Sequence, residues 1–185
     1  MSSSTPQAEY LRRELPYLWL DAYSAMTRRR TNVVIFTQGS FDYVYDDYAS
    51  LEASGAVDPD ENIEARLVGA IGFSRPNPRR RDDSRLRGWV GPTGATFGGQ
   101  WDKGHFIAHS IGGAVDGLEA NVFLQRRTVN RGAYRRMERY CAANAGVLCF
   151  SRPLYSDESA RPSDVEFGIL KPTGELWIEV FSNCE

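Results

Sequence analysis

The clearest pattern along the chain is a series of short apolar runs, rich in β-branched residues and separated by turn residues. Runs of this length and composition are typical of strands. They predict strands over 32–37, 66–73, 121–124, 147–150, 165–170 and 176–181, the first of them buried. Pro172-Thr173-Gly174 lies between the last two runs, and its composition predicts a hairpin turn.

Helical spacing of apolar positions marks the N-terminal segment, about 5–30. Thr5 is expected as the N-cap, with Pro6 at the first helical position. Pro16 is expected to break this segment into two pieces, because a proline removes a helical hydrogen bond. The second piece is expected to end in the arginines of 28–30, where cations suit a helix C-terminus.

A second helical segment carries Asn130 near its start and is expected to end at Asn144 or Gly146 in a left-handed conformation. The stretch 41–51 lacks a clean period and predicts a helix or an irregular segment, whereas 54–62 has the composition of a loop. The stretch 74–100, with prolines and glycines, predicts a long surface excursion. The elements together predict one α+β domain over residues 1–185 with a mainly antiparallel sheet flanked by helices.

Composition excludes some classes of protein. Apolar and charged fractions of 42% and 25% are those of a globular domain, and no apolar run is long enough to cross a membrane. The N-terminus lacks the pattern of a secretory signal, so we expect a cytoplasmic protein unless a specialised system exports it. Three cysteines argue against a disulfide framework. Cys141 and Cys149 flank a helix-to-strand turn, and buried free thiols are favoured over a pair.

The formal net charge of −2 hides a segregation of charge along the chain. Acidic residues gather in 42–64, while arginines gather in 75–87 and 126–139. Arginine presents a planar fork that matches phosphate, so the two basic clusters indicate a nucleic-acid surface despite the overall sign. The acidic stretch is a candidate cover for that surface.

Candidate chemistry is concentrated in about 101–142. His105 follows a glycine that would let a ligand approach closely, and an imidazole can take a proton from water near neutral pH. Asn130 and Glu138 offer the oxygen ligands that Mg²⁺ accepts in small number. On an ideal helix these two lie about 80° apart around the axis and roughly 12 Å apart along it. A bend, or a position of Asn130 just before the helix, would bring them closer. Structural alternatives remain: Asn130 as an N-cap, and Glu138 as a surface partner of Arg135.

The order of these pieces resembles the DNA/RNA non-specific endonucleases, the ββα-metal nucleases with a D-R-G-H signature typified by Serratia nuclease and endonuclease G. The matching pieces are D-K-G-H at 102–105, N-V-F-L-Q at 121–125, N-R-G-A-Y at 130–134, and Glu138. The resemblance covers about 101–141 and implies the ββα-metal (His-Me finger) fold.

The resemblance also implies roles. His105 would be the general base, Asn130 the direct ligand of Mg²⁺, for which Mn²⁺ can substitute, and Glu138 the holder of one of the ion's waters. Asp102 and Gly104 would shape the turn before the histidine, and Asn121 would support the site structurally. The substrate would be DNA and RNA, cut to 5′-phosphate ends.

Two positions depart from the family pattern. The signature arginine is Lys103, and the position four after the glutamate, often a phosphate-contacting arginine, is Ala142. Arg135, Arg136 and Arg139 on the same helix are candidates to compensate. Because an unsecreted nuclease endangers its own genome, we also expect restraint, such as an inhibitor or immunity protein or a role as a toxin or defence effector.

Three other readings compete with this one. His105 and His109 have the spacing of helical zinc ligands, but Phe106 replaces the glutamate of H-E-x-x-H, and a strand would point the two rings apart. A non-catalytic nucleic-acid-binding module would explain the arginines but not the order of histidine, asparagine and glutamate. A purely structural protein explains neither.

Overall fold

The chain folds around one six-stranded antiparallel sheet. The computed structural model describes residues 5–57, 63–77, 100–114 and 119–184. Neighbouring strands follow the order β1-β2-β3-β6-β7-β8, and every pair is antiparallel. The strands are β1 (Val33–Gln38), β2 (Phe41–Asp46), β3 (Arg66–Phe73), β6 (Leu148–Leu154), β7 (Asp164–Leu170) and β8 (Leu176–Ser182). The strands after residue 147 and their hairpin turn confirm the sequence prediction.

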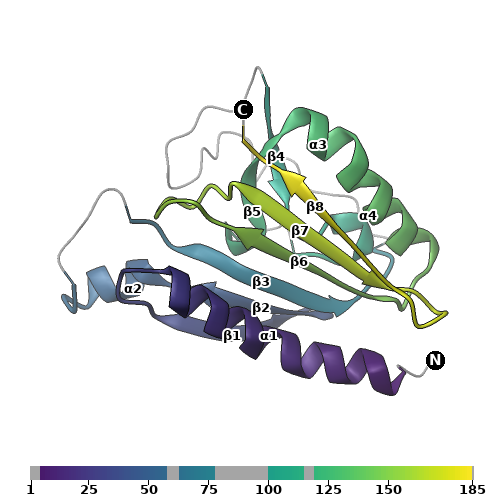
Figure 1. Ribbon diagram of the computed structural model, residues 1–185, viewed down its shortest axis with the longest axis horizontal. Coiled ribbons are helices and arrows are strands. Elements are labelled where there is room, and N and C mark those ends of the chain that lie inside the picture. The colour runs from purple at the N-terminus through teal and green to yellow at the C-terminus, as the bar shows by residue number, and fades with distance from the viewer. Residues whose placement is uncertain (1–4, 58–62, 78–99, 115–118, 185) are drawn as a thin grey trace.

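A second, smaller unit lies between β3 and β6 in the chain. Its strands β4 (Trp101–His105) and β5 (Val122–Arg126) pair with each other in a two-stranded antiparallel sheet. Two helices follow, α3 (Arg127–Arg131) and α4 (Ala133–Ala143). This hairpin and its helices form the ββα unit expected from the sequence (Figure 1). The short elements α2 (Tyr48–Ala53), η1 (His109–Ile111) and η2 (Glu119–Asn121) complete the described chain.

The sheet separates two hydrophobic cores. One core joins the ββα unit to the sheet, with Tyr134 and Met137 of α4 packed among residues of β7 and β8. The other lies under α1 (Pro6–Met26), whose Trp19 packs against Phe150 of β6. Because β6 alternates, Phe150 faces α1 while Ser151 faces α4 and hydrogen-bonds to Tyr134.

The helix α1 is continuous, which makes the predicted break at Pro16 wrong. Thr5 caps it as expected, with its side chain accepting from the amide of Ala8. Pro16 is buried inside the helix beside Trp19, so packing against the sheet offsets the lost hydrogen bond. The helix ends at Met26, before the arginines of 28–30 that were expected to end it. None of the described helices is long and apolar enough to span a membrane.

Two predictions for the first hairpin are also wrong. β1 was expected to be buried, but it is an edge strand whose Val34 and Ile35 are exposed. The segment 41–46 was expected to be helical or irregular, but it is β2. A register shift between Val44 and Tyr45 interrupts the alternation there, and that shift explains why no strand period was visible.

A buried ion pair fastens α1 and the segment after it to the first hairpin. Arg29 lies 2.7 Å from Asp46, and both side chains are almost fully buried, at 4% and 0% exposure. The hydroxyl of Tyr23 donates to the same carboxylate at 2.6 Å, and the amide of Asn32 donates to its other oxygen. The acidic stretch 42–64 was a candidate cover for the basic surface. Its described members Asp42 and Asp46 instead form local ion pairs on the α1 side of the sheet.

Removal of the buried carboxylate in Asp46→Ala should cost about 3–5 kcal/mol, because among the described residues it leaves the buried Arg29 with only the longer ion pair to Glu158 at 3.5 Å. Asp42→Ala is the matched control, since Asp42 pairs with Arg12 at a partly exposed position, and should cost about 1 kcal/mol or less. Urea unfolding of both variants measures the difference. Equal losses would show that the Arg29–Asp46 pair does not hold the hairpin.

Candidate active site

A cleft of about 630 Å³ lies where the β4–β5 hairpin meets α3 and α4. Most of the residues singled out in the sequence line it. They are Asp102, Lys103 and His105 from β4, Asn130 from α3, and Arg135 and Glu138 from α4. Arg131, His109, Ser110 and Ala108 complete the lining. Arg139 is exposed and is not among the lining residues, so the structure does not bring this predicted residue to the cleft.

The break between α3 and α4 brings the asparagine and the glutamate to one cleft. Gly132 separates the two helices, with φ −102° and ψ −115° that no helix continues through. A Cβ at this position would lie 2.5 Å from the carbonyl oxygen of Thr128, so only glycine fits. A bend, one of the two arrangements expected from the sequence, is therefore present. Asn130 lies inside α3, which removes its alternative role as an N-cap.

Asp102 holds Asn130 in place. The Nδ2 of Asn130 donates to Oδ2 of Asp102 at 3.2 Å, while Arg131 donates to both oxygens of the same carboxylate at 2.8 and 3.0 Å. Arg127 donates a further bond at 3.2 Å. Because its Nδ2 bonds to Asp102, the amide of Asn130 presents Oδ1 as the atom that can bind a cation.

The charge of Asp102 is fixed by these donors. Burial alone would raise the pKa of this carboxyl, but the hydrogen bonds from Arg131, Asn130 and Arg127 lower it below its ordinary value. Asp102 is therefore an anion at neutral pH and acts as a hydrogen-bond hub between β4 and α3.

Glu138 has the opposite environment. Burial raises the pKa of its carboxyl to about 7, although the positive charge of Arg135 opposes the rise. Glu138 is thus not a surface partner of Arg135. A carboxylate held in such a place favours a neighbouring positive charge, and a divalent cation would supply it.

His105 is carried at the end of β4 next to a glycine that the packing requires. A Cβ at Gly104 would lie 2.3 Å from Oε1 of Gln125, whose side chain crosses over the glycine. A side chain of the protein thus explains the glycine, where the sequence had suggested an approaching ligand. The ring of His105 is half-buried, with its Nε2 atom buried.

Three fixed contacts hold the loop that follows His105. Asn121 is fully buried and bonds to the amide and carbonyl of Ile107 and to the carbonyl of Ala114, at 2.7–2.9 Å. The hydroxyl of Tyr134 donates to the carbonyl of Phe106 at 2.7 Å. Phe106 stacks on Phe123 with ring centroids 4.1 Å apart. Asn121 thus supports the site structurally, as its predicted role requires.

The two histidines line the same cleft, whereas the sequence suggested that their rings point apart. His109 lies in η1, and its Nε2 is 3.0 Å from Nδ2 of Asn77. No group of three or more histidine, cysteine or acidic side chains suited to a metal occurs within the described ranges. Cys141 and Cys149 are buried free thiols, as favoured from the sequence.

Arg131 is the functional candidate that sequence reasoning missed. It lines the cleft and forms the shortest bond to Asp102. No sequence signal singled it out, because residues adjacent on a helix point in different directions and its bond to Asp102 depends on how α3 packs on β4.

A family model and several solved structures are similar to this chain. The family model described as DNA/RNA non-specific endonuclease matches residues 62–170, more than half of the chain. No curated protein matches. A solved structure titled "Structure of Sda1 nuclease with bound zinc ion" is 16% identical, covers 88% of this chain and 81% of its own, and gives a TM-score of 0.41. A solved structure titled "extracellular endonuclease" is 12% identical, covers 85% of this chain and 81% of its own, and gives a TM-score of 0.37.

Replacing Asn121 by aspartate tests the loop support. The carboxylate would face the carbonyls of Ile107 and Ala114, so burial and repulsion should raise its pKa in the folded state. A raised carboxyl pKa means that the folded state binds more protons, so stability should fall as pH rises. Asn121→Asp should therefore lose about 1–3 kcal/mol, and more at pH 8 than at pH 5.

Asn144→Asp is the control, because Asn144 bonds only at the end of α4 and is half-buried. Urea unfolding at the two pH values measures both variants. A loss for Asn121→Asp that does not grow with pH relative to this control would contradict the proposed geometry.

Proposed function

The chain belongs to the DNA/RNA non-specific endonuclease family, and from this premise we propose that it hydrolyses phosphodiester bonds of DNA and RNA with a divalent cation in the Asp102–Glu138 cleft. The observation that supports the proposal most is that His105, Asn130 and Glu138, distant in sequence, line one cleft. A binding module without catalysis would have no need to gather an imidazole, an amide and a carboxylate.

His105 is the general base in this proposal. Its imidazole takes a proton from a water molecule as the water oxygen bonds to phosphorus. The bond between phosphorus and the 3′-oxygen breaks on the opposite side, and the leaving oxygen takes up a proton from solvent. The products then carry a 5′-phosphate and a 3′-hydroxyl. The fixed loop around Phe106 and Asn121 holds the ring in position for each turnover.

Asn130, through Oδ1, and Glu138, through its carboxylate, would hold the cation. A bound divalent cation would stabilise negative charge on the phosphoryl and leaving oxygens. Mg²⁺ fits this site best, with Mn²⁺ as a substitute, because it takes few protein ligands and prefers oxygen. Zinc sites usually have three or more protein ligands, and the described residues form no such group.

Arg135 and Lys103 are the proposed phosphate contacts. Both line the cleft, and their positive charges suit the substrate backbone. Arg131 also lines the cleft, but it is committed to Asp102 by two bonds, so its main role is to position Asn130. Arg139 is left out of this set, and Ala142 is exposed and adds no charge.

His105→Ala should lose nearly all cleavage of supercoiled plasmid while still binding DNA, because only the base is removed. The assay compares purified wild type and variant in Mg²⁺ and in EDTA, with a gel-shift assay for binding. His109→Ala is the matched control, since His109 lines the same cleft without a role in proton transfer, and should retain most of its activity. Near wild-type turnover in His105→Ala would contradict the role of His105 as the general base.

Asn130→Ala should lose activity and require more Mg²⁺, because it removes the ligand oxygen. Titrating Mg²⁺ against the rate of plasmid cleavage measures the shift. Asp102→Asn should shift the requirement in the same direction by about 10–100-fold, because partners that orient a ligand typically have effects of this size. An unchanged Mg²⁺ requirement in Asn130→Ala would remove this residue from the coordination shell.

A further inference from the structure

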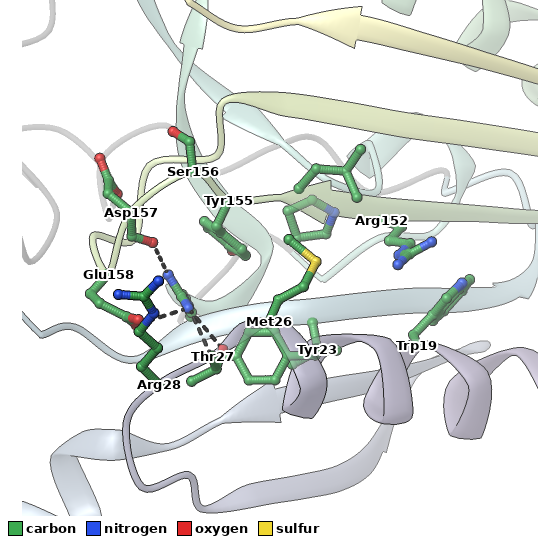
Figure 2. Close-up of a pocket in the computed structure, with 14 residues that line it drawn as sticks. Trp19, Tyr23, Met26, Thr27, Arg28, Arg152, Tyr155, Ser156, Asp157 and Glu158 are labelled. Carbon is green, nitrogen blue, oxygen red and sulfur yellow. Dashed lines mark hydrogen bonds and ion pairs between the residues drawn. The ribbon is translucent and has the colours of Figure 1, made fainter.

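A second cavity of about 690 Å³ lies on the other face of the sheet from the cleft. It is formed by the C-terminal half of α1, by β3, by the end of β6 and by the segment 155–158 (Figure 2). Side chains alternate along β6, so Arg152 points to the opposite face of the sheet from Ser151, which faces α4. The cavity that Arg152 lines is therefore on the α1 side. Its volume is in the range of small-molecule sites.

The middle of this cavity is apolar. Trp19 and Met26 from α1 face Pro153 and Leu154 from β6 across it. In Figure 2 the Met26 side chain extends between the Arg28 end and the Arg152 end. Met26 is 63% exposed and so can move aside or cover a ligand, as flexible methionines do at binding surfaces.

Arg152 gives one end of the cavity an unbalanced positive charge. In the register of β6 and β7 it lies directly opposite Glu166, a carboxylate within reach of a cross-strand pair. Yet the two form no ion pair, and Arg152 lines the cavity instead. Its guanidinium is half-buried, always charged, and has no hydrogen bond or ion pair within the described part of the chain. A half-exposed guanidinium with no anion beside it among the described residues leaves this end positively charged and able to bind an anionic group.

The opposite end is different in character. Arg66 is buried there and is already satisfied, since it bonds to Tyr23, Thr27 and Glu158. Arg28 is exposed and shares this end with the carboxylates of Asp157 and Glu158, and Glu158 pairs with Arg66 and Arg29. The carboxylate and hydroxyl oxygens at this end can accept hydrogen bonds from N–H and O–H groups of a ligand.

We propose that this cavity binds one nucleotide unit, with its phosphate on Arg152 and its base against Trp19 and Met26. A phosphate matches the fork of a guanidinium, a flat base matches the apolar middle, and the sugar hydroxyls and base amines match the far acceptors. The choice of a nucleotide rests on the nuclease activity of the family, which releases such molecules. The site itself does not depend on the His105 mechanism.

Direct binding of 5′-dAMP in EDTA tests the proposal by isothermal titration calorimetry, because no cleavage or metal is needed. The wild type should bind one equivalent saturably. Arg152→Met should weaken binding at least about tenfold, the effect of losing a charge-assisted contact. Arg13→Met is the matched control, because Arg13 is an exposed arginine of α1 that does not line the cavity. This variant should bind 5′-dAMP as the wild type does. Arg152→Met should also cleave plasmid at the wild-type rate.

Met26→Ala separates the contribution of the base to binding from the contribution of the phosphate. It should weaken binding of 5′-dAMP but leave binding of inorganic phosphate unchanged, and deoxyadenosine should bind more weakly than 5′-dAMP. Three results would overturn the proposal: no saturable binding of 5′-dAMP, equal binding by Arg152→Met in a variant with wild-type thermal stability, or inorganic phosphate binding as tightly as the nucleotide. If His105→Ala still cleaved DNA, the proposed mechanism would be wrong, but these binding measurements would still test the cavity.

The same assay shows whether the nucleotide unit in the cavity is a free mononucleotide or the 5′ end of a strand. A 5′-phosphorylated dinucleotide that binds more weakly than 5′-dAMP would identify the free mononucleotide as the ligand. Equal or tighter binding of the dinucleotide would identify the 5′ end of a strand. Either result supports the site.

Discussion

The candidate site depends on one half-buried carboxylate. Asp102 on β4 accepts hydrogen bonds from Arg127, Asn130 and Arg131, all on α3. This anion joins three side chains of α3 to the hairpin, beside the backbone bond from the amide of Arg127 to the carbonyl of Gln100. Bonded to Asp102, the amide of Asn130 is held with Oδ1 available to a cation. In the proposed mechanism, the first residue of the D-K-G-H run therefore positions Asn130, the proposed ligand of the cation.

The large sheet supplies the rigidity that this arrangement needs. The ββα unit lies in the chain between two adjacent strands, β3 and β6, and its last helix, α4, leads directly into β6. Tyr134 then joins α4 to the loop after His105 and to Ser151 of β6. A site held on strands and helices in this way keeps its geometry better than one held on loops.

Much of the fold was predictable because most strands are β-branched runs bounded by turn residues. The failures came where tertiary contacts override local signals. Pro16 is tolerated because the helix around it packs on the sheet. β2 was missed because its register shift between Val44 and Tyr45 interrupts the alternation of side chains. An apolar run also cannot show whether its strand is central or at an edge, so the exposure of β1 was invisible. In the site, the spacing of Asn130 and Glu138 offered a bend as one of two possibilities without placing it at Gly132. The partnership of Arg131 with Asp102 required the register of hairpin and helix.

The most direct test of the central claim is to locate the cation. Crystals of His105→Ala grown with Mn²⁺ in place of Mg²⁺, and measured at a wavelength that distinguishes manganese, would show its position by anomalous scattering. The geometry predicts one peak in the cleft, about 2 Å from Oδ1 of Asn130 and on the side of Glu138. A peak on His109, or an empty cleft in crystals whose wild-type counterpart cleaves DNA, would contradict it.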